Sequence, residues 1–365
     1  MTQAETTLRI VRLDRLRALA VLAVIVYHVV QMSPLPLPGI AALTKYGQYG
    51  VDLFFVLSGW LIGGLYWREL RSNGGVNLRR FWMRRWIRTL PPYFAALLIS
   101  CFAVRLTRGE PFDWTYLVFL QNYRDVMPFF LVSWSLCIEE HFYIIAPVTA
   151  GALIAFAPRT WLGPLWLLLV VLSAGLRWIE WQPVKSEAFG YFTVATHLRL
   201  DGLVLGFGSS YFAVFAPKAL DWFVARAHWF AGAGVACLVA LELAGGQARY
   251  VLWSLTAAVF CTTLVIASGV SRNLVPDSSR VSLTFLWKPI ALASYSAYLI
   301  HPLCIHAARS GAAAMGSYGY ILYFPTVLLL IVVATAVFYF CVEKPSIWVR
   351  DELTSGHRAV AVRSS

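Results

Sequence analysis

The chain has 365 residues, of which 59% are hydrophobic, 15% aromatic and only 13% charged, and its mean hydropathy is +0.67. A soluble domain averages about 25% charged residues, so this composition excludes an ordinary soluble globular domain and predicts an integral membrane protein with several spans. The net charge of +12 does not indicate nucleic-acid binding, because the Lys and Arg residues lie between apolar runs, where they usually set membrane orientation.

Apolar runs of spanning length follow one another along the chain and predict an all-α, polytopic protein. We expect about ten transmembrane helices, near residues 15–33, 48–67, 90–106, 130–156, 161–178, 197–216, 228–244, 250–269, 284–306 and 319–342. The segment 114–120 is too short to cross, so we expect it at the interface or dipping in behind other helices. The runs predict one membrane domain over 1–345 and a short tail over 346–365.

Basic residues are distributed unequally between the two sides that these spans define. Nineteen of the thirty Lys and Arg residues fall on the side of the termini and eight on the other, so the positive-inside rule predicts that both termini are cytoplasmic. No small-residue cleavage site follows the first apolar run, which we therefore interpret as a span and not as a signal peptide. The six cysteines form no Cys-x-x-Cys pair; they predict buried small hydrophobes, with no disulfide framework and no metal site.

The first apolar helix carries a histidine deep in its hydrophobic run. Arg17 and His28 are eleven residues apart, so on a helix they share one face and lie roughly 16.5 Å apart along the axis. Ionisable side chains inside a span are costly and by default mark a functional path. A neutral, hydrogen-bonded histidine in a helix bundle is the alternative.

The densest basic run covers residues 79–88 and leads into the third span. Arg85 and Arg88 are three residues apart with Arg84 beside them, a spacing that can grip a phosphate from two directions. The alternative is that these arginines only anchor a cytoplasmic loop near anionic lipid.

The fourth span contains three consecutive ionisable residues, Glu139, Glu140 and His141. Successive helical residues diverge by about 100°, so at most one or two of the three can face the same interior space. Three such groups facing lipid would be prohibitively unfavourable. At least one is therefore expected to line a polar cavity.

The second span opens with residues 50–59 and places Asp52 near the outer surface. Small residues, including Ser58, favour close packing of helices. Asp52 is expected to contact a substrate or an adjacent loop.

Polar residues recur towards the C-terminus. Arg199 and Asp201 stand at the outer end of the sixth span, where an ion pair with other helices is the leading interpretation. Tyr295 precedes His301, which is expected to end the ninth span at the same outer level, and Glu343 is expected to close the tenth at the inner surface.

Seven segments together resemble the acyltransferase-3 family of bacterial integral membrane O-acyltransferases. In chain order they are LDRLRALAVLAVIVYH at 13–28, GVDLFFVLSGWLI at 50–62, RRFWMRRWIRTLPPY at 79–93, WSLCIEEHFY at 134–143, LRLDGLVLG at 198–206, SYSAYLIHPL at 294–303 and VEKP at 342–345.

The resemblance implies transfer of an acyl group, most often acetyl, from cytoplasmic acyl-CoA to a hydroxyl of a cell-surface glycan, a glycolipid or a small molecule. It implies the bacterial inner membrane as location, acetyl-CoA as co-substrate and no metal. The Arg17–His28 pair matches a family hallmark, and Arg85 with Arg88 matches the family element linked to the acyl donor.

The sequence departs from the family pattern at Arg15, Cys137 and His141, where glycine, serine and glutamine are common. The last two lie beside the carboxylate pair, which leaves open which of Glu139 and Glu140 serves the site. No extracytoplasmic esterase-like domain follows in this sequence, so we expect any such partner to be a separate protein. The oligomeric state and the acceptor are not determined by the sequence.

A mechanism follows as a hypothesis. Arg84, Arg85 and Arg88, with Arg17, form the donor site, and Asp14 is a further polar candidate. His28 acts as general base, with Glu139 or Glu140 orienting it or holding its proton. Transient acylation of His28 is a second route. A polytopic transporter of a glycan or small molecule is the competing function, but the internal repeat often seen in transporters is not found. A purely structural subunit would not need three ionisable residues in mid-span.

Overall fold

The computed structural model describes residues 3–124, 126–156, 161–181, 194–270 and 284–363, and every regular element among them is helical. The α-helices, in order, are α1 (Gln3–Gln31), α2 (Pro38–Thr44), α3 (Gly50–Asn73), α4 (Leu78–Arg108), α5 (Trp134–Phe156), α6 (Leu162–Glu180), α9 (Asp201–Phe215), α10 (Pro217–Ala225), α11 (Ala227–Ala244), α12 (Gly246–Val270), α13 (Thr284–Leu292), α14 (Ser294–Ala314), α15 (Ser317–Phe338) and α16 (Lys344–Arg363). Short helical turns join them at η1 (Lys45–Tyr49), η2 (Trp114–Leu117), η3 (Gln121–Tyr123), η4 (Leu131–Ser133), η6 (Thr196–Leu198) and η8 (Tyr339–Glu343).

Six helical stretches in the described part of the chain are long and apolar enough to cross a membrane, or seven if α9 and α10, bent by 115°, count as one span. The described part of the chain is thus all-helical and contains several candidate membrane spans, whereas the expected count of about ten spans is not confirmed. One reason is that α9 covers only part of the expected run 197–216 before the chain turns at Ala216. Another is a break inside the expected run 284–306.

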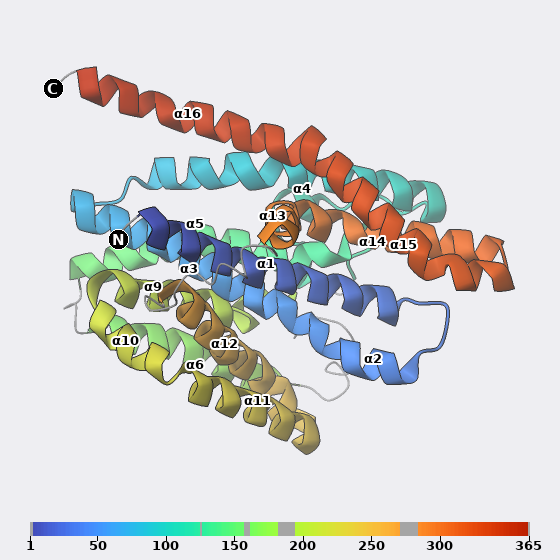
Figure 1. The fold of residues 1–365 in the computed structure, drawn as a ribbon, viewed down its shortest axis with the longest axis horizontal. Coiled ribbons are helices and arrows are strands. Elements are labelled where there is room, and N and C mark those ends of the chain that lie inside the picture. Colours follow the sequence, from blue (N-terminus) through green and yellow to red (C-terminus); the bar gives the residue numbers. More distant parts are fainter. Residues whose placement is uncertain (1–2, 125, 157–160, 182–193, 271–283, 364–365) are drawn as a thin grey trace.

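That break lies at Ala293, between α13 and α14, which run in different directions (Figure 1). As a result α14 begins inside the bundle, and His301 lies in its second turn instead of ending a span at the outer surface. Glu343 closes a π-helical turn, η8, and is fully buried. Its carboxylate accepts hydrogen bonds from the backbone N–H and hydroxyl of Ser296, so it caps the first turn of α14, where the helix dipole favours a negative charge.

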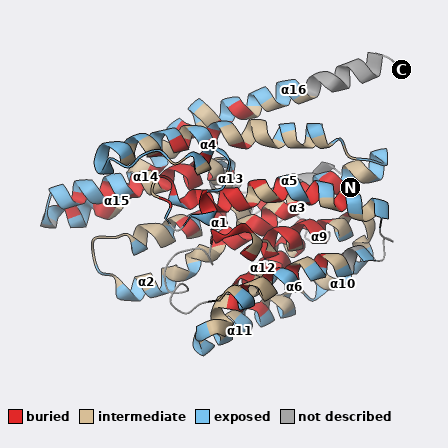
Figure 2. Cartoon of the chain, turned by 180° about the vertical axis from the view of Figure 1, so that it is seen from behind, coloured by how far each residue is buried: buried red, intermediate tan, exposed pale blue. Residues whose placement is uncertain are grey.

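The centre of the molecule is built from α1, α3, α5, α9 and α14, where buried residues concentrate. In contrast, α11, α15 and residues 344–354 of α16 are exposed over much of their length (Figure 2). The closest packing joins α3 to α9. A methyl group on Gly59 would overlap the carbonyl oxygen of Leu203, and one on Gly206 would overlap that of Val56. Small residues in this pair of helices therefore permit backbone-to-backbone approach, as the sequence predicts for the second span.

Two ion pairs are buried beside this contact. Arg199 pairs with Asp52 at 3.2 Å, and Arg177 pairs with Asp201 at 2.8 Å, with all four side chains at most 3% exposed. The Arg199 guanidinium also lies 4.3 Å from the centre of the Trp253 ring. These are the ion pairs with other helices that the sequence predicts for Arg199 and Asp201, and they give Asp52 a protein partner.

The basic run forms part of α4, a continuous helix of 31 residues that passes through Pro91 and Pro92. After α4 the chain turns back, and Tyr116 is fully buried and accepts a hydrogen bond from Tyr93 through its carbonyl at 2.8 Å. Tyr116 therefore anchors the segment 114–120 behind α4. The rest of the segment stays nearer the surface, with Trp114, Leu117, Val118 and Leu120 exposed.

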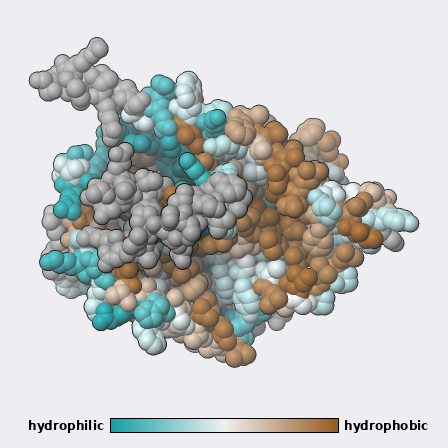
Figure 3. Space-filling view, viewed as in Figure 1, coloured by the Kyte–Doolittle hydropathy of each residue, from teal (hydrophilic) through white to brown (hydrophobic). Residues whose placement is uncertain are grey.

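The start of α1 and the end of α16 lie at the same end of the bundle (Figure 1). Hydrophilic side chains gather at that end of the visible face, and apolar side chains cover much of the rest (Figure 3). This arrangement fits a helix bundle with one polar end and an apolar belt that faces lipid.

Candidate active site

A cavity of about 440 Å³ opens among the helices. Its walls come from α1, α3, α4, α5, α14 and α16, so segments from both ends of the sequence contribute to it. Residues Val51 and Asn73 of α3 both line it. They are 22 residues apart, which on a helix corresponds to roughly 33 Å. The cavity is thus a long funnel that reaches deep between the helices.

The cavity wall is strongly cationic. Seven arginines line it, against two carboxylates, Glu69 and Glu139; the arginines are Arg17, Arg68, Arg80, Arg84, Arg85, Arg88 and Arg350. Such a surface in a low-dielectric setting selects a ligand with several negative charges. Guanidinium groups are particularly suited to phosphate, which they bind in a bidentate manner.

Arg85 is held in place by a network around Glu139. Its guanidinium donates to the Glu139 carboxylate at 3.2 Å and to the Tyr143 hydroxyl at 2.5 Å, and that hydroxyl donates to the same carboxylate at 2.9 Å. Ser58 of α3 donates to the other carboxylate oxygen at 2.8 Å. Ser58 therefore has a polar role at the cavity in addition to the packing expected of it.

Glu140 and His141 point away from the cavity wall. Glu140 accepts from the Trp86 indole and the Thr89 hydroxyl, each at 3.1 Å. The His141 ring lies 2.7 Å from the hydroxyl of Thr196. The three consecutive ionisable residues thus face three different environments. Of the three, Glu139 lines the cavity.

Two cavity arginines differ from Arg85 in their surroundings. Arg17 pairs with Asp14 at 3.5 Å, one turn earlier on α1. The Arg88 side chain makes no hydrogen bond or ion pair with the residues that the structure describes. An arginine that lines a cavity without a carboxylate partner is well placed to bind an anionic ligand.

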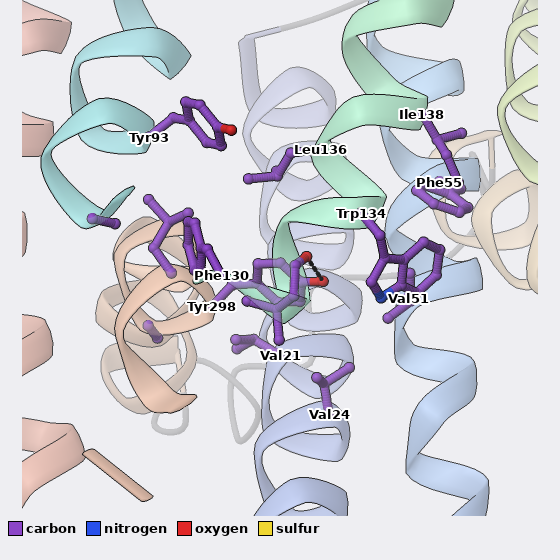
Figure 4. Packing of buried hydrophobic residues seen from close by; sticks show 14 of the residues in the cluster. Val21, Val24, Val51, Phe55, Tyr93, Phe130, Trp134, Leu136, Ile138 and Tyr298 are labelled. Atoms are coloured by element: carbon purple, nitrogen blue, oxygen red, sulfur yellow. Dashed lines mark hydrogen bonds between the residues drawn. The ribbon is translucent and has the colours of Figure 1, made fainter. Parts of the chain in front are cut away.

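The deep end of the cavity is closed by aromatic side chains. Tyr295 and Tyr298 of α14 line it together with Phe54. Tyr295 donates to the carbonyl of Thr89 at 2.9 Å, and the Tyr298 hydroxyl lies 2.7 Å from that of Ser135. Figure 4 shows Tyr298 where residues of α1, α5 and the preceding loop meet.

His28 lies behind Tyr298 and is not among the residues that line the cavity. Its Nδ1 is 3.1 Å from Nε2 of His301 on α14, and His301 is fully buried. The ring centre of His301 is 5.7 Å from that of Tyr298. His28 therefore has a histidine partner, whereas the carboxylates expected to orient it, Glu139 and Glu140, are bound to other groups.

Several cavity residues escaped the sequence reasoning. Arg68 and Arg350 entered the sequence prediction only in the count of basic residues that sets the membrane orientation. Arg350 also falls in the expected tail. Tyr298 lines the cavity, and Tyr143 lies beside it and binds Arg85 and Glu139. Both stand inside segments that carry the family resemblance. Within the described ranges, no group of three or more His, Cys, Asp or Glu residues could hold a metal ion.

An Arg-lined funnel between apolar helices, with a pair of histidines beside it, has the charge and depth that an acyltransferase with a polyanionic donor needs. Comparison with known families agrees, because the model of the family described as "Acyltransferase domain" matches residues 10–342. The chain belongs to this family.

The chain is similar to two proteins that carry O-acetyltransferase names. The peptidoglycan O-acetyltransferase OatA of Listeria monocytogenes is 32% identical over 190 residues, which cover 47% of this chain and 28% of that protein. The O-acetyltransferase OatA of Staphylococcus aureus is 30% identical over 224 residues, which cover 53% of this chain and 33% of that protein. The chain thus matches about a third of the length of these relatives. No solved structure matches it.

Proposed function

We propose that this protein is an O-acetyltransferase of the bacterial inner membrane that moves an acetyl group from cytoplasmic acetyl-CoA to a hydroxyl of a cell-surface glycan, a glycolipid or a related acceptor. The observation that carries the proposal is the funnel lined by seven arginines. Acetyl-CoA has a polyanionic nucleotide end and a thin arm that carries the thioester, and the funnel offers positive charge and depth for the two parts. The termini then lie in the cytoplasm.

In this mechanism the arginines bind the phosphates of the donor. Arg84, Arg85, Arg88 and Arg17 act as the donor-binding set, with Asp14 positioning Arg17. Arg85 also depends on Glu139, whose carboxylate fixes the direction of the guanidinium through the contact at 3.2 Å. Glu139 is thus assigned to donor positioning, while Glu140 stabilises the contact between α4 and α5.

His28 is the general base. It takes the proton of the acceptor hydroxyl while the oxygen attacks the acetyl carbon; the C–O ester bond forms, the C–S bond breaks, and the proton passes to the departing thiolate, which leaves as CoA. Tyr298, which lines the funnel and whose ring centre lies 5.7 Å from that of His301, separates the thioester from the histidine pair in this mechanism. Transient acylation of His28 is the second route to the same products.

The test uses purified protein in nanodiscs with acetyl-CoA labelled in the acetyl group. We expect release of free CoA and transfer of label to a hydroxyl acceptor, tested with peptidoglycan fragments and lipid-linked glycans. Sealed vesicles of both orientations distinguish the side of donor binding, since only exposure of the cytoplasmic face should support turnover. Protein that neither binds acetyl-CoA nor releases CoA with any acceptor would refute the proposal.

A further inference from the structure

The contacts of the two histidines behind the funnel determine which ring nitrogens carry hydrogen. His301 is buried in α14, and its Nδ1 lies 3.2 Å from the carbonyl oxygen of Ala297, one turn earlier on the same helix. A carbonyl oxygen can only accept, so Nδ1 of His301 carries the hydrogen in this contact. In a neutral imidazole the other nitrogen, Nε2, is then an acceptor.

The same reasoning fixes the hydrogen on His28. Its Nδ1 lies 3.1 Å from the acceptor Nε2 of His301, so Nδ1 of His28 is the donor in this contact. The backbone carbonyl of Val24, one turn earlier on α1, is a further acceptor for the His28 ring. That leaves Nε2 of a neutral His28 without a hydrogen and with its lone pair available. A base or nucleophile needs such a lone pair, and the ring orientation set by the second nitrogen decides which atom offers it.

We propose that His301 is a positioning residue that holds His28 in the Nδ1–H tautomer, with His28 Nε2 as the atom that takes the acceptor proton. This inference rests on the proposed function for the role of His28 and adds the residue that orients it. His301 takes the part of the third group in a nucleophile–base–orienter arrangement. After proton transfer it accepts from the His28 imidazolium through the same contact and stabilises its charge.

The surroundings of the pair suit this role. His301 is fully buried, so its ring cannot turn towards water. The ring of Tyr298 lies against it at 5.7 Å, between the histidine pair and the funnel. The position of α14 is in turn fixed at its first turn by the Glu343 carboxylate. The acceptor nitrogen of His301 is therefore presented to His28 by a rigid helix.

The experiment compares three variants. His301→Leu removes the acceptor, whereas His301→Gln keeps a side-chain oxygen that can accept from His28 Nδ1–H. His306→Leu is the matched control, because His306 is on the same helix and exposed. We expect His301→Leu to lower kcat about 10–100-fold, the range for partners that orient a reacting group, with KM for acetyl-CoA unchanged. His301→Gln should recover most of kcat, and the control should match the natural protein.

A second readout does not depend on turnover. Nitrogen NMR of ¹⁵N-histidine-labelled protein in nanodiscs should show His28 with a protonated Nδ1 and an unprotonated Nε2, and His301→Leu should shift His28 towards the Nε2–H form. A natural protein with hydrogen on His28 Nε2, or full kcat in His301→Leu, would overturn the inference. Equal losses in the Gln and Leu variants, both folded by size exclusion, would also overturn it. Absence of acetyl-CoA turnover with the expected NMR result would refute the proposed function alone.

Discussion

Replacement of Arg88 by Gln tests whether the funnel binds the phosphates of the donor. Arg88 lines the cavity from α4, and the described residues offer it no hydrogen bond or ion pair. Its removal therefore leaves no buried carboxylate without a partner. The loss of donor affinity should therefore equal the contribution of the contact between Arg88 and the ligand. Arg85→Gln is harder to interpret, because it also removes the ion-pair partner of Glu139.

The expected magnitude follows from the kind of contact. A hydrogen bond that involves a charged group contributes about 1.5–3 kcal/mol, and each 1.4 kcal/mol corresponds to about a factor of ten. We expect KM for acetyl-CoA, or Kd for a non-hydrolysable analogue, to rise roughly 10–150-fold, with little change in kcat.

The decisive comparison uses a second donor without phosphates, the acetyl thioester of N-acetylcysteamine. This short donor reaches the same acetyl chemistry but offers nothing for Arg88 to bind. We expect Arg88→Gln to leave its kcat/KM unchanged. A loss of the same size with both donors, or no loss with either, would refute the reasoning and return these arginines to the role of lipid anchors.

Three other changes test the chemistry and the fold. His28→Ala should lose about 10²–10⁴ in turnover while inserting normally, measured as CoA release, because positioned general-base catalysis contributes that much; near-normal turnover would remove His28 from the mechanism. Asp52→Leu should lower the thermal unfolding midpoint, since breaking a buried ion pair costs about 3–5 kcal/mol. The double variant Asp52→Leu with Arg199→Leu should recover part of the lost midpoint. An Asp52→Leu midpoint equal to that of the natural protein would argue against a stabilising ion pair. Gly59→Ala should destabilise the contact of α3 with α9, whereas Gly232→Ala, where a methyl group meets nothing, should not, as measured by fluorescence-detected size exclusion after heating.

Helix ends were predicted well where they depend on local apolar residues and poorly where they depend on distant contacts. The run 228–244 was predicted almost to its ends because a spanning helix needs only a local stretch of apolar residues. The run 284–306 was predicted as one helix, yet the chain breaks at Ala293. Local hydropathy does not signal this break. The helix that begins after it is capped by Glu343, which is 47 residues beyond Ser296 and belongs to a neighbouring element.

Properties of neighbouring residues were enough to predict a helical membrane protein, to find its densest basic run at 79–88 and to place His28 within an apolar helix. The tertiary structure alone decided that Glu139 and not Glu140 lines the funnel, and that His301, 273 residues from His28, is its hydrogen-bond partner. Hydropathy and charge are carried by each residue, whereas a hydrogen bond between distant side chains exists only once helix packing has fixed their distance and direction.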